Sequence, residues 1–378
     1  MNARPYARLH GLDGIRGVAA LFVVLHHCWL LSFPGYPRDT GPWWLGWLIY
    51  GHFAVVVFIV LSGFSLSIAP ARSAWQIRSV REFARRRAWR ILPPYWAALV
   101  FSLAVAWWIV AQPNTDEPTA KSVAVYGFLV QDIIGSPSPN GAFWSIAIEA
   151  QLYLLFPLLL LVRRRWSAAV MLGSMTAIVV MTATLAPHDR YVDKLMRLTP
   201  QFGALFTVGI VAAGILVASD RVRQLPWHWL ALIAVVPVVL VIGSRGSVWT
   251  VSNFTWVDLA LGPATALLLA GVAVGKPMIL VRPLESRPLQ RLGACSYSLY
   301  LTHSPIVVTV HHVLRRLDME PGIPMFFVTL AIAVPLAVVF AMWFATLFEI
   351  PFQRHRSWAS WREVVSARWG TRSVGETE

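Results

Sequence analysis

Long apolar runs recur along the whole chain and leave few ways for it to fold. We predict membrane spans from runs of about 17 to 25 residues at 15–33, 44–68, 94–111, 143–162, 167–186, 201–218, 227–243, 255–274, 295–313 and 323–348. Because lipid offers the backbone no hydrogen-bond partners, such runs cross a bilayer as helices. We therefore expect an all-α, polytopic integral membrane bundle of about ten transmembrane helices. A shorter run, 122–134, is a candidate re-entrant or interfacial piece.

Charge is scarce and unevenly distributed between the predicted loops. Charged residues make up 13% of the chain and hydrophobic residues 57%, which is typical of a helical membrane protein. With the N-terminus inside, 23 Lys and Arg residues fall on one side of the predicted spans and eight on the other. The positive-inside rule then places both termini in the cytoplasm. The net charge of +14 thus reflects topology and indicates no nucleic-acid partner. We expect a multi-pass protein of the bacterial cytoplasmic (inner) membrane.

The ends of the chain and its cysteines carry little further signal. No small-residue cleavage site follows the first apolar run, so we expect an uncleaved first span. Cys28 and Cys295 fall within predicted spans and are expected to pack as small apolar residues rather than to form a disulfide. No metal-ligand spacing is present. We predict a transmembrane domain over 1–351 and a basic cytoplasmic tail over 352–378.

A histidine pair deep in the first span is the most unusual polar feature. An ionisable side chain inside the bilayer is costly and by default indicates function. Arg16 precedes His27 by eleven residues, which places it on the same helix face, about 16 Å away. Glu149, on the antiparallel fourth span, is predicted at nearly the same depth as His27. These positions suit a shared site. His26 lies about 100° away on the helix, and a packing role is expected for it.

Five sequence segments together resemble one known family. They are 12–17 (LDGIRG) leading to His26 and His27, 58–64 (FIVLSGF), 85–96 (RRRAWRILPPYW), 143–153 (FWSIAIEAQLY) and 297–305 (YSLYLTHSP). In this order they resemble the motifs of the membrane-bound acyltransferase-3 family over 12–351. The resemblance implies an integral membrane O-acyltransferase that moves an acyl group, usually acetyl, from cytoplasmic acyl-CoA to a hydroxyl, most often of a sugar. Some relatives carry a further hydrolase-like domain after the last helix. We expect none here, so that the membrane domain itself handles the acceptor.

Chemical roles follow from residue type. A histidine accepts a hydroxyl proton near neutral pH, so we predict His27 as general base, with Glu149 in support. Guanidinium groups bind phosphates in a bidentate manner. We therefore predict that Arg16, Arg86, Arg87 and Arg90 bind acyl-CoA, and the family resemblance implies acetyl as its acyl group. The alternatives are that His27 only bonds a neighbouring helix, and that the arginines only set topology or bind anionic lipid.

Other polar residues in these segments are candidates for supporting the site or contacting the acceptor. They are Asp13, His26, Ser62, Trp144, Ser145, Tyr153, Tyr297, Tyr300 and His303. Gly63 beside Ser62 favours close helix packing over a nucleophilic serine. Packing is an equal alternative for His303, and an interfacial position for Tyr297 and Tyr300.

The acceptor and the competing class stay open at this level. A surface polysaccharide, a lipid-linked sugar and a glycosylated metabolite are all compatible acceptors. The loops at 112–142 and 187–200 are long enough to recognise one. A transporter or acyl-group conduit, with His27 and Glu149 as a proton relay, is the alternative. The absence of a paired repeat between the two halves disfavours it.

Overall fold

The structure, a computed structural model, describes residue 9 and residues 11–354, and every regular element in that part of the chain is helical. The long helices are α1 Leu12–Ser32, α2 His52–Ala71, α3 Val80–Trp108, α5 Trp144–Arg165, α6 Ala168–Leu185, α8 Gln201–Ala212, α10 Trp227–Ser252, α11 Phe254–Ala273, α14 Ser296–Arg316 and α15 Ile323–Phe344. The predicted all-α fold is confirmed. The predicted tail lies outside the described residues, apart from 352–354.

Short elements connect or extend these helices. They are η1 Gly46–Tyr50, α4 Ala120–Gly127, η2 Ala186–His188, α7 Arg190–Met196, η3 Ala213–Val217, α9 Asp220–Arg223, α12 Met278–Leu284, α13 Arg287–Ala294, the π-helical η4 Ala345–Glu349 and α16 Ile350–Arg354. The two long loops predicted from the sequence therefore contain α4 and α7.

Eight helices in the described part of the chain are long and apolar enough to cross a membrane. A ninth span results if α7 and the α8–η3 segment, which are bent by 47° relative to each other, count as one. The predicted span at 295–313 is the long helix α14, which carries three histidines and is too polar to meet the same test. α14 packs on α1, α15 and α3, and the polar side chains of its first half, such as Ser298, Thr302 and His303, are buried.

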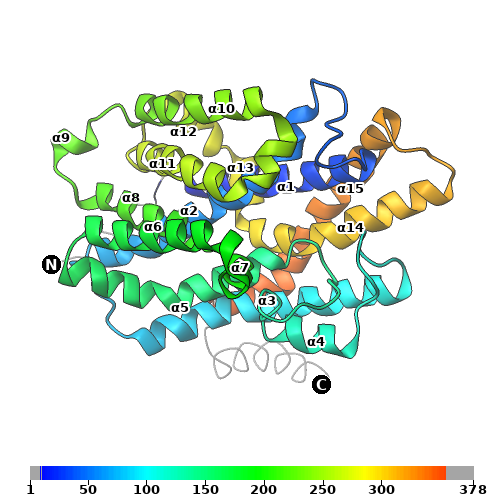
Figure 1. Cartoon of the computed structure of the whole chain (residues 1–378), viewed down its shortest axis with the longest axis horizontal. Helices are drawn as coiled ribbons and strands as arrows, with labels where there is room; N and C mark the ends of the chain where they lie inside the picture. Colours follow the sequence, from blue (N-terminus) through cyan, green and yellow to red (C-terminus); the bar gives the residue numbers. More distant parts are fainter. Residues whose placement is uncertain (1–8, 10, 355–378) are drawn as a thin grey trace, which may run out of the picture.

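Helix packing brings the N-terminal and C-terminal thirds of the chain together. α1 packs on α13, α14 and α15, whereas α2 packs on α8 and α11, and α10 covers α11. The long helices run along the long axis of the molecule, with α9 near one end and the connection between α14 and α15 at the other (Figure 1). Helices α1, α2, α3, α5 and α14 meet near the centre of the molecule.

The close crossing of α2 and α8 depends on two glycines. A Cβ on Gly63 would lie 2.1 Å from the Phe206 carbonyl oxygen, and one on Gly209 would lie 2.1 Å from the Val60 carbonyl oxygen. The two backbones are therefore in contact, as small residues permit in membrane helices. The close approach predicted for Gly63 is confirmed, and it fixes the helix face that carries Ser62.

The arginine-rich segment before the third span is helical, which corrects the predicted loop. The Ser79 side chain accepts a hydrogen bond from the Glu82 backbone N–H at 3.2 Å and caps α3 well before its two prolines. Glu82 also pairs with Arg86 one turn later. Pro93 and Pro94 accordingly lie inside α3 rather than at its start. As a result the arginines are held on a continuous helix, where side chains three positions apart share a face.

Other boundaries depart less from the sequence pattern. The predicted span 44–68 is divided into η1 and α2, and α10 extends to Ser252 across a kink at Gly246, whose φ is +78°. The end of α4 packs beside the middle of α3, where Trp96 Nε1 donates to the Gly127 carbonyl at 3.0 Å. Cys28 and Cys295 are buried and free, as predicted.

Candidate active site

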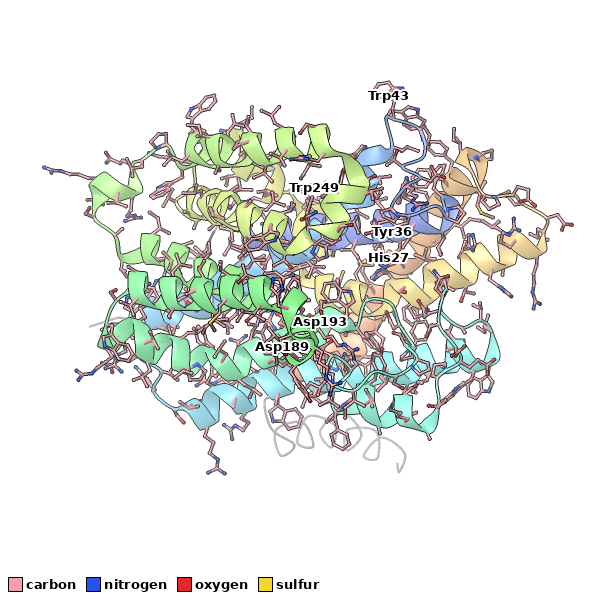
Figure 2. The ribbon with its side chains drawn as sticks, viewed as in Figure 1. His27, Tyr36, Trp43, Asp189, Asp193 and Trp249 are labelled. Atoms are coloured by element: carbon pink, nitrogen blue, oxygen red, sulfur yellow. The ribbon has the colours of Figure 1, made fainter. Side chains whose placement is uncertain are left out.

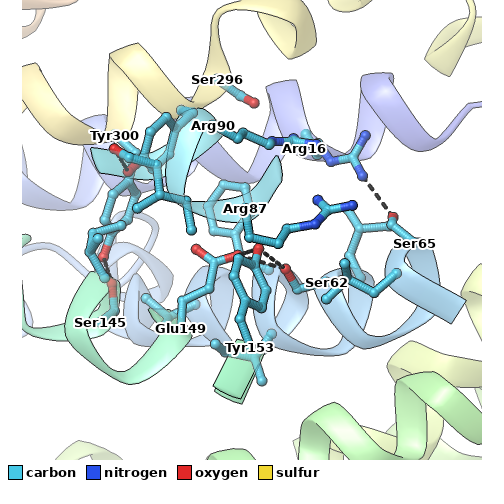
Figure 3. A pocket seen from close by; sticks show the side chains of 18 residues that line it. Arg16, Ser62, Ser65, Arg87, Arg90, Ser145, Glu149, Tyr153, Ser296 and Tyr300 are labelled. Carbon is cyan, nitrogen blue, oxygen red and sulfur yellow. Dashed lines mark hydrogen bonds between the residues drawn. The ribbon is translucent and has the colours of Figure 1, made fainter. Parts of the chain in front are cut away.

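A pocket lies at the centre of the bundle, between α1, α2, α3, α5 and α14 (Figure 3). It encloses about 810 Å³, including the part that is open to solvent, a size that suits small-molecule sites. Apolar side chains of α2, among them Val55, Phe58 and Ile59, form one wall. Its polar lining consists of Arg16, Ser62, Ser65, Arg87, Arg90, Ser145, Glu149, Tyr153, Ser296, Tyr297 and Tyr300.

Three of the four predicted cofactor arginines line this pocket. Arg16 pairs with Asp13 at 2.7 Å, and its Nη2 donates to Ser65 Oγ at 2.7 Å. Arg87 lies 5.9 Å from the centre of the Tyr153 ring, and Arg90 follows it one turn later on α3. The three guanidinium groups gather on one side of the pocket (Figure 3). This side therefore concentrates positive charge.

Arg86 occupies a different position from its neighbours. Its side chain is exposed, pairs with Glu82 on the outer surface of α3, and is not among the residues that line the pocket. From the sequence, Arg86 and Arg87 were predicted to have the same role, because a run of three arginines does not show which side of a helix each one occupies. The helical start of α3 separates the two by about 100°.

Glu149 is the centre of a small hydrogen-bond network. Ser62 Oγ donates to Glu149 Oε1 at 2.6 Å, and the Tyr153 hydroxyl donates to the same oxygen. The Ser62 and Tyr153 oxygens are 3.0 Å apart. Tyr153 lies four residues after Glu149 on α5, hence on the same face. The carboxylate is thus held by two hydroxyls and not by an imidazole, and the structure gives it no hydrogen bond to His27.

His27 is held instead by a backbone carbonyl and by a second histidine. Its Nδ1 lies 2.8 Å from the Val23 carbonyl oxygen and 3.3 Å from Nε2 of the fully buried His303. His303 Nδ1 lies 2.8 Å from the Tyr300 carbonyl oxygen. A carbonyl only accepts hydrogen bonds, so in the neutral rings both Nδ1 atoms carry the hydrogen. His303 Nε2 then accepts from His27, and His27 keeps its lone pair on Nε2.

The histidine pair lies beyond the wall of the pocket. The Tyr300 ring lines the pocket, and its centre is 5.8 Å from that of His303, which is 4.7 Å from that of His27. The Tyr300 hydroxyl is 2.6 Å from Ser145 Oγ, which also lines the pocket. His27, labelled in Figure 2, is partly buried on α1. The structure therefore brings His27 near the pocket through His303 and Tyr300, and not into contact with Glu149.

The remaining candidates from the sequence have separate contacts. His26 Nδ1 is 2.7 Å from the Leu48 carbonyl oxygen, a contact that joins α1 to η1. Trp144 stacks on His52, with ring centres 5.9 Å apart, outside the pocket. The Tyr297 hydroxyl donates to the Ile91 carbonyl at 3.2 Å. Tyr297 and Tyr300 both line the pocket.

Two buried carboxylates escaped the sequence argument. Glu349, in the π-helical turn η4, is 3% exposed and accepts from the Ser298 backbone N–H at 3.2 Å and from its Oγ at 2.6 Å. It thereby caps the start of α14, the helix that carries Tyr300 and His303. Asp258 is fully buried and pairs with His52 at 2.9 Å. Both lie in or next to apolar runs, so the argument that singled out His27 would have found them.

Comparison of the sequence with known proteins identifies relatives of this chain. Residues 9–344 match a family model described as "Acyltransferase domain". YrhL of Bacillus subtilis (strain 168), whose name describes a peptidoglycan O-acetyltransferase, is 26% identical over 79% of this chain and 48% of its own length. "Nodulation protein 10" of Rhizobium leguminosarum bv. viciae is 25% identical over 82% of this chain and 86% of its own length.

Another relative is the O-acetyltransferase OatA of Staphylococcus aureus (strain NCTC 8325 / PS 47), which is 25% identical over 80% of this chain and 51% of its own length. The match thus spans about half the length of YrhL and of OatA. No solved structure matches the chain. Since the family model covers most of the described helices, the chain belongs to the acyltransferase-3 family, and it is a multi-pass membrane protein of that family.

Proposed function

We propose that this protein transfers an acetyl group from acetyl-CoA to a hydroxyl of a carbohydrate acceptor in the bacterial inner membrane. The family match and the relatives named as O-acetyltransferases support acyl transfer to oxygen. YrhL is named for peptidoglycan, which supports an acceptor of the carbohydrate class. We further propose that coenzyme A carries the acyl group and that this group is acetyl.

One observation carries the proposal: Arg16, Arg87 and Arg90 converge from α1 and α3 on one side of a pocket that is also lined by apolar side chains of α2. Arginine forks match phosphate geometry, so this side suits the phosphates of CoA. The apolar wall formed by α2 suits the extended pantetheine arm and the acyl group. We propose that Arg86, being outside the pocket, acts on CoA only through its charge.

The proposed chemistry uses the free lone pair on His27. An acceptor hydroxyl gives its proton to His27 Nε2 while its oxygen attacks the thioester carbonyl carbon. The tetrahedral intermediate then collapses, the carbon–sulfur bond breaks, and the sulfur leaves as the CoA thiol after taking the proton from the imidazolium. The products are an ester and CoA, and no oxidant or metal is required for this balance.

The positions of the two polar clusters set a direction for the substrate in this scheme. CoA phosphates at the arginines leave the thioester end pointing toward Tyr300, behind which His303 and His27 lie. Glu149, fixed by Ser62 and Tyr153, contributes a carboxylate to the same pocket. Since the arginine-rich loops are predicted to be cytoplasmic, the acyl group would cross toward an acceptor on the outer face.

Purified protein in liposomes tests the activity. Acetyl-CoA labelled on the acetyl group, supplied with a membrane glycan extract, should lose its label to a product from which mild alkali releases acetate. A transporter or conduit would move the label across the membrane without forming an ester. His27→Ala should remove ester formation, and His26→Ala, on the neighbouring face, is the matched control.

Sealed vesicles of known orientation test the direction. Acetyl-CoA is expected to act only from the face that carries the arginine-rich loops, and the acceptor only from the opposite face. Full activity with both substrates on one face would refute the transmembrane route. It would leave the acyltransferase assignment in place.

A further inference from the structure

An apolar groove lies on the bundle surface, away from the arginine pocket. α8, η3 and α11 form its floor, and α6 and the start of α10 flank it. Figure 1 shows α8 and α11 between α6 and α10. The groove encloses about 830 Å³, including the part that is open to the outside. Its floor is lined by the small residues Ala212, Gly214, Ala218, Ala266 and Ala270.

The flanking helices present apolar side chains to the surroundings, as expected beside lipid. On α6, Ile178 and Met181 are 48% and 57% exposed, and on α10, Ile233 and Leu240 are 68% and 67% exposed. In a membrane these faces contact hydrocarbon. A groove between two lipid-facing helices is therefore open to acyl chains from the side. An acyl chain fills such a floor of small residues without any polar group being buried.

Nitrogen atoms that lack a hydrogen-bond partner lie in the groove wall and beside it. Arg163 Nη1, Trp227 Nε1 and His228 Nδ1 are buried and have no hydrogen-bond partner in the described part of the chain. Trp227 lines the groove itself. A Cβ on Gly214 would lie 3.5 Å from Arg163 Nη2, which places this guanidinium against the groove wall.

The charge around this end is mainly positive. Arg163 stacks on the Trp75 ring at 3.4 Å, which fixes its position. Arg221 and Arg223 lie on α9, the element next to the groove, and Asp220 balances only part of their charge. Buried donors without acceptors are costly. An anion with several oxygen atoms would satisfy them, and the apolar floor requires that this anion carry a hydrocarbon tail.

We propose that this groove binds an anionic glycerophospholipid. One acyl chain lies along the small-residue floor, and the phosphate accepts hydrogen bonds from Trp227 Nε1 and Arg163. The inner ends of membrane bundles commonly bind acidic headgroups through basic pockets between helices. The groove shares no lining residue with the arginine pocket, so this inference does not rest on the proposed function.

Two substitutions remove the headgroup contacts with little change in shape. Trp227→Phe keeps an aromatic ring but removes the N–H, and Arg163→Gln removes the charge. Trp229→Phe is the matched control for the first, because Trp229 is 58% exposed on the same helix. Arg164→Gln, at the exposed neighbouring arginine, is the control for the second. Ala212→Leu fills the floor and tests the acyl-chain part separately.

Native mass spectrometry of the full chain in detergent, titrated with dioleoyl phosphatidylglycerol or dioleoyl phosphatidylcholine, measures binding. We expect one tightly retained phosphatidylglycerol, and an about tenfold weaker apparent affinity in each headgroup variant, since a hydrogen bond to a charged group is lost. Ala212→Leu should weaken the binding of both lipids. The controls should bind like wild type.

Three results would overturn the proposal. Equal retention of both lipids by wild type would refute recognition of the headgroup. An equal loss of affinity in the control variants would show that the headgroup contacts are not specific. A stable dimer in which cross-links at Ala212 join two copies would show that protein covers the groove. If Trp227→Phe unfolds, Arg163→Gln and Ala212→Leu still decide the outcome.

Discussion

Replacing His303 by phenylalanine removes the side chain that orients His27 while leaving the proposed base itself in place. His27 Nδ1 then keeps one acceptor, the Val23 carbonyl at 2.8 Å, and loses the other, His303 Nε2 at 3.3 Å. A single hydrogen bond between neutral groups is worth about 0.5 to 1.5 kcal/mol. At 1.36 kcal/mol per tenfold in rate, the loss corresponds to a roughly 2- to 13-fold slower transfer.

Removing His27 itself should be far more damaging. A general base contributes about 10²- to 10⁴-fold to the rate, so the rate of His27→Ala should be roughly eightfold or more below that of His303→Phe. His303→Gln should recover part of the lost rate, because its amide oxygen can accept from His27 Nδ1. The rate should therefore decrease in the order wild type, His303→Gln, His303→Phe and His27→Ala.

The assay is the initial rate of alkali-labile acetyl ester formation at saturating acetyl-CoA. It uses membranes of the native host, in which each variant replaces the chromosomal copy and its amount is measured by immunoblot. Equal rates for His303→Phe and His27→Ala would refute the reasoning, because His303 would then be as essential as the proposed base. A His27→Ala variant at the wild-type rate would remove His27 from the chemistry.

Three further outcomes follow from other parts of the structure. Arg87→Ala should raise the KM for acetyl-CoA about tenfold or more by removing a charge-assisted phosphate contact, whereas Arg86→Ala, outside the pocket, should change it little; equal effects would contradict the assignment. Glu349→Ala leaves the buried Ser298 groups unpaired at a cost of about 1–3 kcal/mol, so its Tm should fall further than that of Glu349→Gln, in calorimetry or by intrinsic fluorescence. Burial raises the pKa of Asp132 to about 7, so the folded state retains a proton that the unfolded chain releases near pH 4. The resulting stability is fully present below about pH 4 and is lost progressively between about pH 4 and about pH 7. The Tm of Asp132→Asn relative to wild type should therefore increase between about pH 4 and about pH 8, and a constant difference would show that Asp132 does not titrate in this range.

The sequence determined the fold class and most helix positions, because burial in lipid requires long apolar runs whatever the tertiary packing. The predicted spans at 15–33, 143–162 and 295–313 correspond to α1, α5 and α14 within a few residues. Boundaries were wrong where local capping outweighs hydropathy. Ser79 and Glu82 start α3 in a polar segment. A scan for apolar runs does not detect a helix start that depends on capping by polar side chains.

The sequence also placed several pocket residues correctly on helices, without showing which of them meet. The Arg16 and His27 spacing is local helix geometry, fixed by the chain itself. By contrast, the partners of Glu149 and His27 come from other helices, and their identity depends on how α1, α2, α5 and α14 are rotated and shifted. Equal depth in a bilayer made contact between Glu149 and His27 plausible from the sequence.

Only the tertiary structure decided that Ser62 and Tyr153 hold Glu149, that His303 holds His27, and that Arg86 faces away from the pocket. The physical reason is that side-chain contacts act over about 3 Å, whereas sequence periodicity fixes a residue only to a helix face and a depth. Helix rotations of a few tens of degrees exchange one partner for another. Those rotations are set by close contacts such as Gly63 against the Phe206 carbonyl, which become visible only when the helices are packed together.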